Sequence, residues 1–269
     1  MRWTLRGSWL KFLHPAIVAV SSLLFIIEYL LVYVSEALGI LSALAAALIL
    51  YGLLSILKVS DALSRALENI SILFIYILLM AGLPWFYLSQ SLLVPGVYSL
   101  VMALCFWQES AKNPEMDLKK LLNHLGIKRE NLYRNLLLGV VGVPLGAIEY
   151  FMLKSYLPPP SPSFDMLYVA QTAVYMFFFV ALGEEILFRA MIQRSLAAFM
   201  TPWSSVFWSA VIFASMHTIW RSIPEIFFVF AAGLLLGAVY LKTKSLIGPI
   251  AIHAINNIML LAIMPYIAH

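Results

Sequence analysis

The sequence predicts an all-α membrane protein, a polytopic transmembrane bundle of about eight or nine helices. Three observations predict this fold class. Of the 269 residues, 63% are hydrophobic and 11% are charged, whereas roughly a quarter of the residues of a soluble domain are charged. Apolar runs recur that approach the roughly 20 residues that a helix needs to cross the hydrocarbon core. The runs are continuous, which favours helices over the alternating strands of a membrane barrel.

The expected spans follow one another along residues 1–269, which we treat as a single integral membrane domain. The first apolar run follows three basic residues and is too long for a cleaved signal peptide. Later spans are separated by the interruption Gly82-Leu83-Pro84, by a polar segment and by a proline-rich loop of sequence LPPPSPS. The predicted spans are 12–34, 38–57, 70–88, 92–107 and 136–156, and further spans begin near 167 and after 202, 224 and 249.

The distribution of Lys and Arg predicts the orientation of the bundle. With the N-terminus in the cytoplasm, all of the 17 Lys and Arg residues except Lys154 and Arg221 fall on the cytoplasmic side, as basic residues do in multi-pass proteins. The N-terminal part of this excess comes from Arg2, Arg6 and Lys11. The expected location is the cell membrane or the membrane of the endoplasmic reticulum.

Residues 108–135 form a long polar segment that we expect in the cytoplasm. Asn113 is a candidate N-cap, and Gly126 fits the position after a helix. Four leucines between them share one helix face: Leu118, Leu121, Leu122 and Leu125. A short amphipathic helix on the membrane surface and a solvated linker helix both fit this pattern.

Ionisable side chains gather in the C-terminal spans. In the stretch ALGEEILFRA, Glu184 and Glu185 follow an apolar run, and Arg189 lies one turn after Glu185 on the same helix face. If the sixth span continues to about Phe199, the following turn is equidistant from Glu184 and His217. Both residues then lie at the same height in an antiparallel helix pair.

In the last span, His253 and Asn257 share one helix face because they are four residues apart. A neutral imidazole and an amide supply N–H donors of the kind that stabilise a developing oxyanion. A buried Glu beside a His can take a proton from water. Together these groups describe the hydrolysis of an amide bond by water.

Competing protease chemistries lack their motifs. The sequence contains no H-E-x-x-H, no G-x-G-D and no G-x-S-x-G. The residues Glu184, His217 and His253 would also suit a zinc site with two His ligands and one carboxylate. We take this as the minority alternative to a site without metal or other cofactor.

Three spaced motifs resemble those of a known family. They are Glu184-Glu185-x-x-x-Arg189, Phe213-x-x-x-His217 and His253-x-x-x-Asn257. They are similar to the motifs of the CAAX-processing and bacteriocin-processing intramembrane proteases, the CPBP or ABI family, which includes the Ras-converting enzymes. The stretch SLIGPIAIHAINN also resembles the surroundings of that family's third motif. The resemblance lies within residues 167–266, which are the expected catalytic helices.

The resemblance implies an intramembrane endopeptidase of the glutamate type. The implied catalytic residues are Glu184, His217, His253 and Asn257, and the implied supporting residues are Glu185, Arg189 and Phe213. The glutamate would be the general base, the first histidine its partner in activating water, and the last two residues the oxyanion hole. The expected partners are the lipid bilayer and a peptide or prenylated-peptide substrate, such as a C-terminal C-a-a-X tail cut after the modified Cys. Nucleic acid is not an expected partner.

Two other function classes use the same residue types. Intramembrane Glu and His side chains carry ions in transporters and proton relays. A non-catalytic membrane scaffold would keep the fold without the chemistry.

Structural roles are expected for several other residues of the spans. Glu149, a lone acid in an apolar run, is expected in a hydrogen bond between helices. Ser222 and Glu225 have the spacing of a capping box at the start of the eighth span. Gly233 and Gly237 form a G-x-x-x-G pattern, which predicts a close contact with another helix.

Overall fold

A computed structural model describes residues 12–82, 90–157 and 164–268. Within these ranges the chain contains no strand, and eight of its helices are long and apolar enough to cross a membrane. The predicted all-α polytopic bundle is therefore confirmed. Three features of the sequence prediction lie outside the described residues: the basic residues Arg2, Arg6 and Lys11, the dipeptide Leu83-Pro84, and residues 158–163 of the proline-rich loop.

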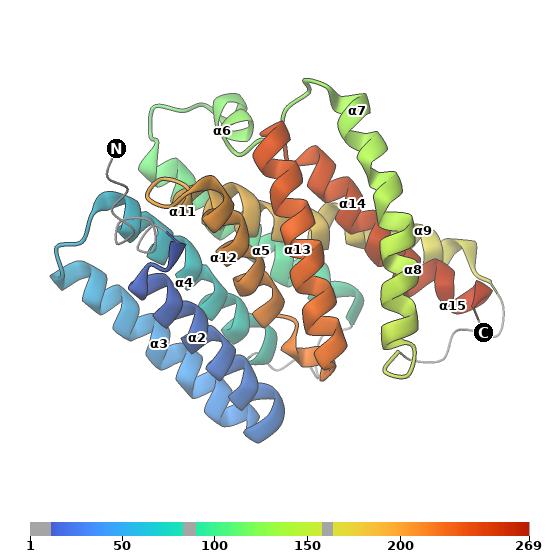
Figure 1. Cartoon of the computed structure of the whole chain (residues 1–269), viewed down its shortest axis with the longest axis horizontal. Coiled ribbons are helices and arrows are strands. Elements are labelled where there is room, and N and C mark those ends of the chain that lie inside the picture. Colours follow the sequence, from blue (N-terminus) through green and yellow to red (C-terminus); the bar gives the residue numbers. More distant parts are fainter. Residues whose placement is uncertain (1–11, 83–89, 158–163, 269) are drawn as a thin grey trace, which may run out of the picture.

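The N-terminal half forms one side of the bundle (Figure 1). Its elements are α2 (Pro15–Tyr29) continued by η1 (Leu30–Val34), α3 (Glu36–Ile56), α4 (Asp61–Ala81) and α5 (Gln90–Lys112). The hydroxyl of Ser60 caps α4 by accepting from the backbone N–H of Leu63. This cap starts α4 at Asp61, before the sequence becomes apolar, so the start predicted at residue 70 is wrong. Arg65 lies in the helix and not in the preceding loop.

The C-terminal half supplies the remaining spans. They are the run α7 (Leu132–Leu137), η3 (Leu138–Val141) and α8 (Gly142–Leu153); the run α9 (Met166–Tyr175), η4 (Met176–Ala181), α10 (Leu182–Glu185), η5 (Ile186–Gln193) and α11 (Arg194–Leu196); α12 (Pro202–Ser215) and η6 (Thr218–Trp220); α13 (Ile223–Thr243); and the run α14 (Ile247–Ile258), η7 (Met259–Ile263) and α15 (Met264–Ile267). With only 14 residues, α12 is shorter than the eight spans.

Two π-helical turns flank the paired carboxylates. The turn η4 precedes α10 and the turn η5 follows it, and α10 carries Glu184 and Glu185. Each π-helical turn changes the rotation of the helix relative to a regular α-helix, so these turns set the directions in which neighbouring side chains point. Such turns are rare and frequently occur at functional sites.

The polar segment packs against the protein itself. The helix α6 (Leu118–His124) is capped by Asp117, whose Oδ1 accepts from the backbone N–H of Lys120 at 2.8 Å, so the N-cap predicted at Asn113 is wrong. Gly126 follows the helix with φ of +89°, as its predicted position requires. Its carbonyl accepts from the backbone N–H of Leu246 at 2.9 Å. The carbonyl of His124 accepts from Arg194 at 2.6 Å. The segment is therefore anchored to two helix ends of the C-terminal half.

Most of the basic loops lie along one edge of the bundle (Figure 1). The turns from α3 to α4, from α11 to α12 and from α13 to α14 lie at this edge together with α6 and the start of α7. The C-terminal end of α8, where Lys154 is the C-cap, lies at the opposite end. This separation is the one that the sequence analysis used to assign an inside and an outside.

Glycines allow α8 and α13 to approach their neighbours closely. A Cβ atom at Gly146 would lie 2.3 Å from the backbone oxygen of Asn256, and one at Gly142 would lie 2.4 Å from that of Ile252. On α13, a Cβ at Gly233 would lie 3.1 Å from the Cβ of Ala210, and one at Gly237 would lie 2.8 Å from the side chain of Gln193. The predicted close contact of the G-x-x-x-G pattern on α13 is therefore present. A second pattern of this kind, Gly142 and Gly146, forms a close contact between α8 and α14.

We predict that Gly146→Ala destabilises the protein because the added methyl group meets backbone atoms that cannot move without separating α8 from α14. Overpacking of this kind costs about 1–3 kcal/mol. Thermal unfolding of the purified protein in detergent measures the loss. The matched control is Gly52→Ala in α3, where an added Cβ has no atom within 4 Å. Equal melting temperatures for both variants would contradict the close contact.

Candidate active site

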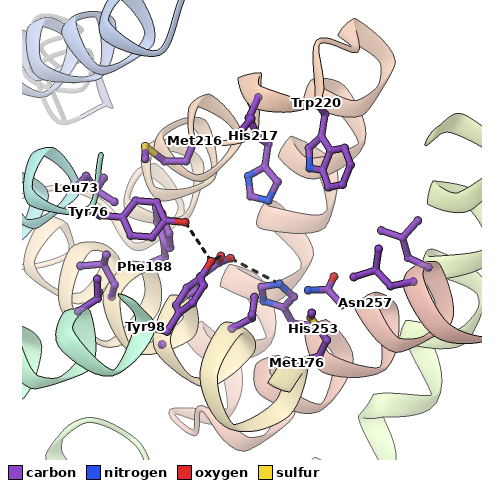
Figure 2. A pocket seen from close by; sticks show the side chains of 18 of the residues that line it. Leu73, Tyr76, Tyr98, Met176, Phe188, Met216, His217, Trp220, His253 and Asn257 are labelled. Atoms are coloured by element: carbon purple, nitrogen blue, oxygen red, sulfur yellow. Dashed lines mark hydrogen bonds and ion pairs between the residues drawn. The ribbon is translucent and has the colours of Figure 1, made fainter. Parts of the chain in front are cut away.

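A cavity of about 230 Å³ lies between the two halves of the bundle. Its wall includes four residues that the sequence analysis singled out, namely Glu184, His217, His253 and Asn257. Side chains from α4 and α5 complete the wall from the N-terminal half. In Figure 2 the two histidines and the amide of Asn257 face the cavity from one side, and two tyrosines face it from the other.

Glu185 points away from the cavity into a buried ion pair. Its Oε2 lies 3.0 Å from Nε of Arg189, and both side chains are completely buried. Its Oε1 lies 2.9 Å from Nδ1 of His253 on α14. The predicted pairing of Glu185 with Arg189 is present, and the same carboxylate also ties α10 to α14.

The hydrogen bond to Glu185 determines what His253 can donate. A carboxylate only accepts hydrogen bonds, so Nδ1 of His253 carries the proton. The Nε2 of the same ring lies 3.7 Å from Oε2 of Glu184. A neutral ring protonated on Nδ1 would present a lone pair to this second carboxylate. The ring is an N–H donor on the cavity side only as an imidazolium ion, so the predicted neutral donor needs correction.

Glu184 projects into the cavity, where a tyrosine from the N-terminal half holds it. The hydroxyl of Tyr98 on α5 donates a hydrogen bond to Oε1 of Glu184. Since this bond uses the proton of Tyr98, its oxygen accepts from the hydroxyl of Tyr76 on α4 at 3.2 Å. A Cβ at Gly183 would lie 2.9 Å from the ring of Tyr98, so the absence of a side chain there allows the close approach.

His217 lies just beyond the C-terminal end of α12, in the turn that leads to η6. Its Nδ1 is 3.0 Å from the carbonyl oxygen of Phe213. A carbonyl oxygen accepts, so Nδ1 carries the proton and Nε2 of the neutral ring presents a lone pair. Within the described part of the chain, His217 makes no direct hydrogen bond to Glu184, and the two residues face the same cavity.

Phe213 is buried between Arg189 and the two histidines of the cavity. Its ring centroid lies 4.7 Å from that of His217 and 5.9 Å from that of His253. The guanidinium carbon of Arg189 lies 4.8 Å from the same ring centroid. Phe213 therefore fixes the position of both imidazoles and covers the buried cation, which agrees with its expected place beside the site.

Asn257 lines the cavity next to a second group of polar residues. Its Oδ1 accepts from Nδ2 of Asn256 at 3.3 Å. Nδ2 of Asn256 also donates to Oε2 of Glu149 on α8. Glu149 therefore makes the hydrogen bond between helices that the sequence analysis expects, and it also reaches the cavity wall.

The described residues offer no group of three or more His, Cys, Asp or Glu side chains that could hold a metal ion. In both histidines considered for zinc, Nδ1 is engaged, by the Glu185 carboxylate in His253 and by a backbone carbonyl in His217. Nε2 is therefore the ring atom of each that could bind a metal ion.

Tyr76 and Tyr98 are the site residues that sequence reasoning missed. Both lie in apolar runs in which an aromatic residue is ordinary, and neither run contains a motif. The only available signal was that each hydroxyl needs a hydrogen-bond partner once it is buried in a span.

Comparison with protein families agrees with the motif resemblance. Residues 167–259 match the family model described as Type II CAAX prenyl endopeptidase Rce1-like. No curated protein and no solved structure matches the chain. The matched residues run from α9 to the start of η7 and contain every predicted site residue. Residues 167–259 of this multi-pass membrane protein are therefore similar to the Rce1-like type II CAAX prenyl endopeptidases.

Proposed function

We propose that this protein is an intramembrane endopeptidase in which Glu184 activates a water molecule. The observation that carries the proposal is the single cavity shared by Glu184, His217, His253 and Asn257. Ionisable groups are expensive inside a membrane and are retained where they serve function. A carboxylate, two imidazoles and an amide around one cavity supply the base and the donors that amide hydrolysis requires.

The reaction begins with water held between Glu184 and His217. The carboxylate takes a proton from the water, and the lone pair on Nε2 of His217 accepts its second O–H. The oxygen attacks the carbonyl carbon of the substrate, and the negative charge moves to the carbonyl oxygen. The C–N bond then breaks, and the leaving amine receives the proton held by Glu184. Each step leaves the number of protons in the site unchanged.

His253 and Asn257 stabilise the charge on the carbonyl oxygen. His253 acts as an imidazolium ion, because its Nδ1–H is already used by Glu185. Its charge is compensated by the two carboxylates on either side of the ring. Removal of one oxyanion donor typically lowers kcat by about 100- to 1,000-fold.

We infer a lipid-modified peptide as the substrate. The family model is named for prenyl endopeptidases, and much of the cavity wall away from the polar residues is apolar. Leu73, Val101, Leu187 and Leu260 belong to this apolar wall. Such a surface suits the aliphatic residues of a C-a-a-X tail, whose scissile bond would lie against Glu184.

The central prediction concerns Glu184→Gln. The amide keeps the shape of the side chain but cannot accept a proton, so turnover of a fluorogenic farnesylated C-a-a-X peptide in detergent falls by about 100-fold or more. Glu36→Gln, on the exposed start of α3, is the matched control and keeps full activity. Retained turnover in Glu184→Gln would remove the base assignment. Inhibition by a chelator, reversed by zinc, would favour the metal alternative.

Tyr98→Phe tests the contribution of the N-terminal half. The loss of one hydrogen bond to a carboxylate leaves Glu184 free to rotate, and a loss of about 1.5 kcal/mol lowers kcat roughly tenfold. The assay is steady-state kinetics with the same peptide. Tyr133→Phe is the control, because Tyr133 is 73% exposed on α7. An unchanged kcat in Tyr98→Phe would show that the hydrogen bond does not position the base.

We propose that the edge of the bundle bearing α6 faces the cytoplasm. The only native cysteine, Cys105, is buried, so single cysteines introduced on the surface can be labelled selectively. A membrane-impermeant thiol reagent applied to intact cells should label Ser155→Cys, at the opposite end. It should label Lys119→Cys on α6 only after permeabilisation. The reverse pattern would invert the orientation.

A further inference from the structure

A pair of buried acids lies behind Asn257, outside the three family motifs. Glu149 is on α8 and Glu225 is in the first turn of α13, and their relative exposures are 5% and 0%. The carboxyl group of Glu149 is near enough to that of Glu225 to interact with it electrostatically, and neither oxygen of Glu225 has a hydrogen-bond partner among the described residues. Ser222 does cap α13 through the backbone N–H of Glu225. The Glu225 side chain, however, does not return to Ser222 as a full capping box would require.

The proximity of the two acids disfavours the ionisation of both. Ionised carboxylates only accept hydrogen bonds, and two negative charges at this distance in a membrane repel strongly. A charge on one of the two groups therefore disfavours a charge on the other.

Asn256 connects the acid pair to the cavity. Its Nδ2 donates one hydrogen to Oε2 of Glu149 and the other to Oδ1 of Asn257. An amide nitrogen has two hydrogens, so both are used. The oxygen of Asn257 is thereby held on the side of Asn256, and its nitrogen points toward His253 (Figure 2).

Rigid elements hold this arrangement in place. Gly142 and Gly146 bring α8 into backbone contact with α14 beside Asn256. The cap at Ser222 fixes the first turn of α13, which contains Glu225. The three groups therefore come from three helices whose separation is set by close packing.

We propose that Glu149, Glu225 and Asn256 form a positioning network that keeps the amide nitrogen of Asn257 turned toward the carbonyl oxygen of the substrate. The proposal rests on the oxyanion role given to Asn257 in the proposed function. The two ends of an amide have nearly the same shape. Without the network, Asn257 could turn its oxygen toward the developing oxyanion, and the donor would become a repulsive group.

A double-mutant cycle in the peptidase assay tests the network. Asn257→Ala lowers kcat by about 100-fold or more because a donor is lost. Asn256→Ala lowers kcat by about tenfold at nearly constant KM, because the donor is present but misdirected. In the Asn257→Ala background, Asn256→Ala has no further effect, since it acts only through Asn257. Losses that multiply in the double variant would overturn the proposal.

Variants of Glu149 provide a second test that does not depend on the folding of Asn256→Ala. Glu149→Gln keeps an oxygen that accepts from Asn256 and gains an N–H that donates to Glu225, so kcat remains within about threefold of that of the wild type. Glu149→Leu removes the acceptor and reproduces the roughly tenfold loss expected for Asn256→Ala. Thermal unfolding in detergent identifies variants that are merely destabilised. Equal loss in both Glu149 variants would exclude a positioning role.

The outcomes separate this proposal from the proposed function. Full turnover in Asn257→Ala would remove the oxyanion assignment, and the network with it. A strong loss in Asn257→Ala combined with wild-type kcat in Asn256→Ala and Glu149→Leu would leave the peptidase intact and overturn the network alone.

Discussion

The buried carboxylate of Glu185 is the interaction on which the candidate site depends. It contacts Arg189 on its own helix and His253 on α14, and all three side chains are shielded from solvent. Burial of a charge is costly, and removal of one partner from such a group typically costs about 3–5 kcal/mol. The geometry of this triad fixes the distance between α10 and α14. The distance between α10 and α14 in turn determines how Glu184 and Asn257 lie relative to one another.

The sequence was sufficient to predict the fold class and the pairing of Glu185 with Arg189, but not the contact of Glu185 with His253. Continuous apolar runs specify helices in a membrane because no other structure satisfies the backbone there. The spacing from Glu185 to Arg189 places both on one helix face whatever the tertiary structure is. Predictions of where helices begin fared less well. The start of α4 and the cap of α6 depend on Ser60 and Asp117, whose side chains give no hydropathy signal.

The side of the cavity formed by the N-terminal half could not be predicted. Tyr98 is one of 13 tyrosines in the chain, and nothing in its local sequence separates it from those that face lipid. Its role arises only because Gly183 lets the ring approach α10. Similarly, Glu149 on α8 and Glu225 on α13 are far apart in the sequence, and their proximity depends on how the two helices pack.

In the mechanism that we propose, the charges around Glu184 explain how hydrolysis can occur in a medium of low dielectric. Before reaction, the negative charges of Glu184 and Glu185 balance the positive charges of Arg189 and the His253 imidazolium. When Glu184 takes a proton from water, its charge disappears and an equal charge forms on the carbonyl oxygen of the substrate. The net charge of the site does not change, and the charge moves from one neighbour of His253 Nε2 to another. Because the imidazolium is already oriented by Glu185, the transfer needs no large rearrangement of dipoles, which is the condition for electrostatic catalysis.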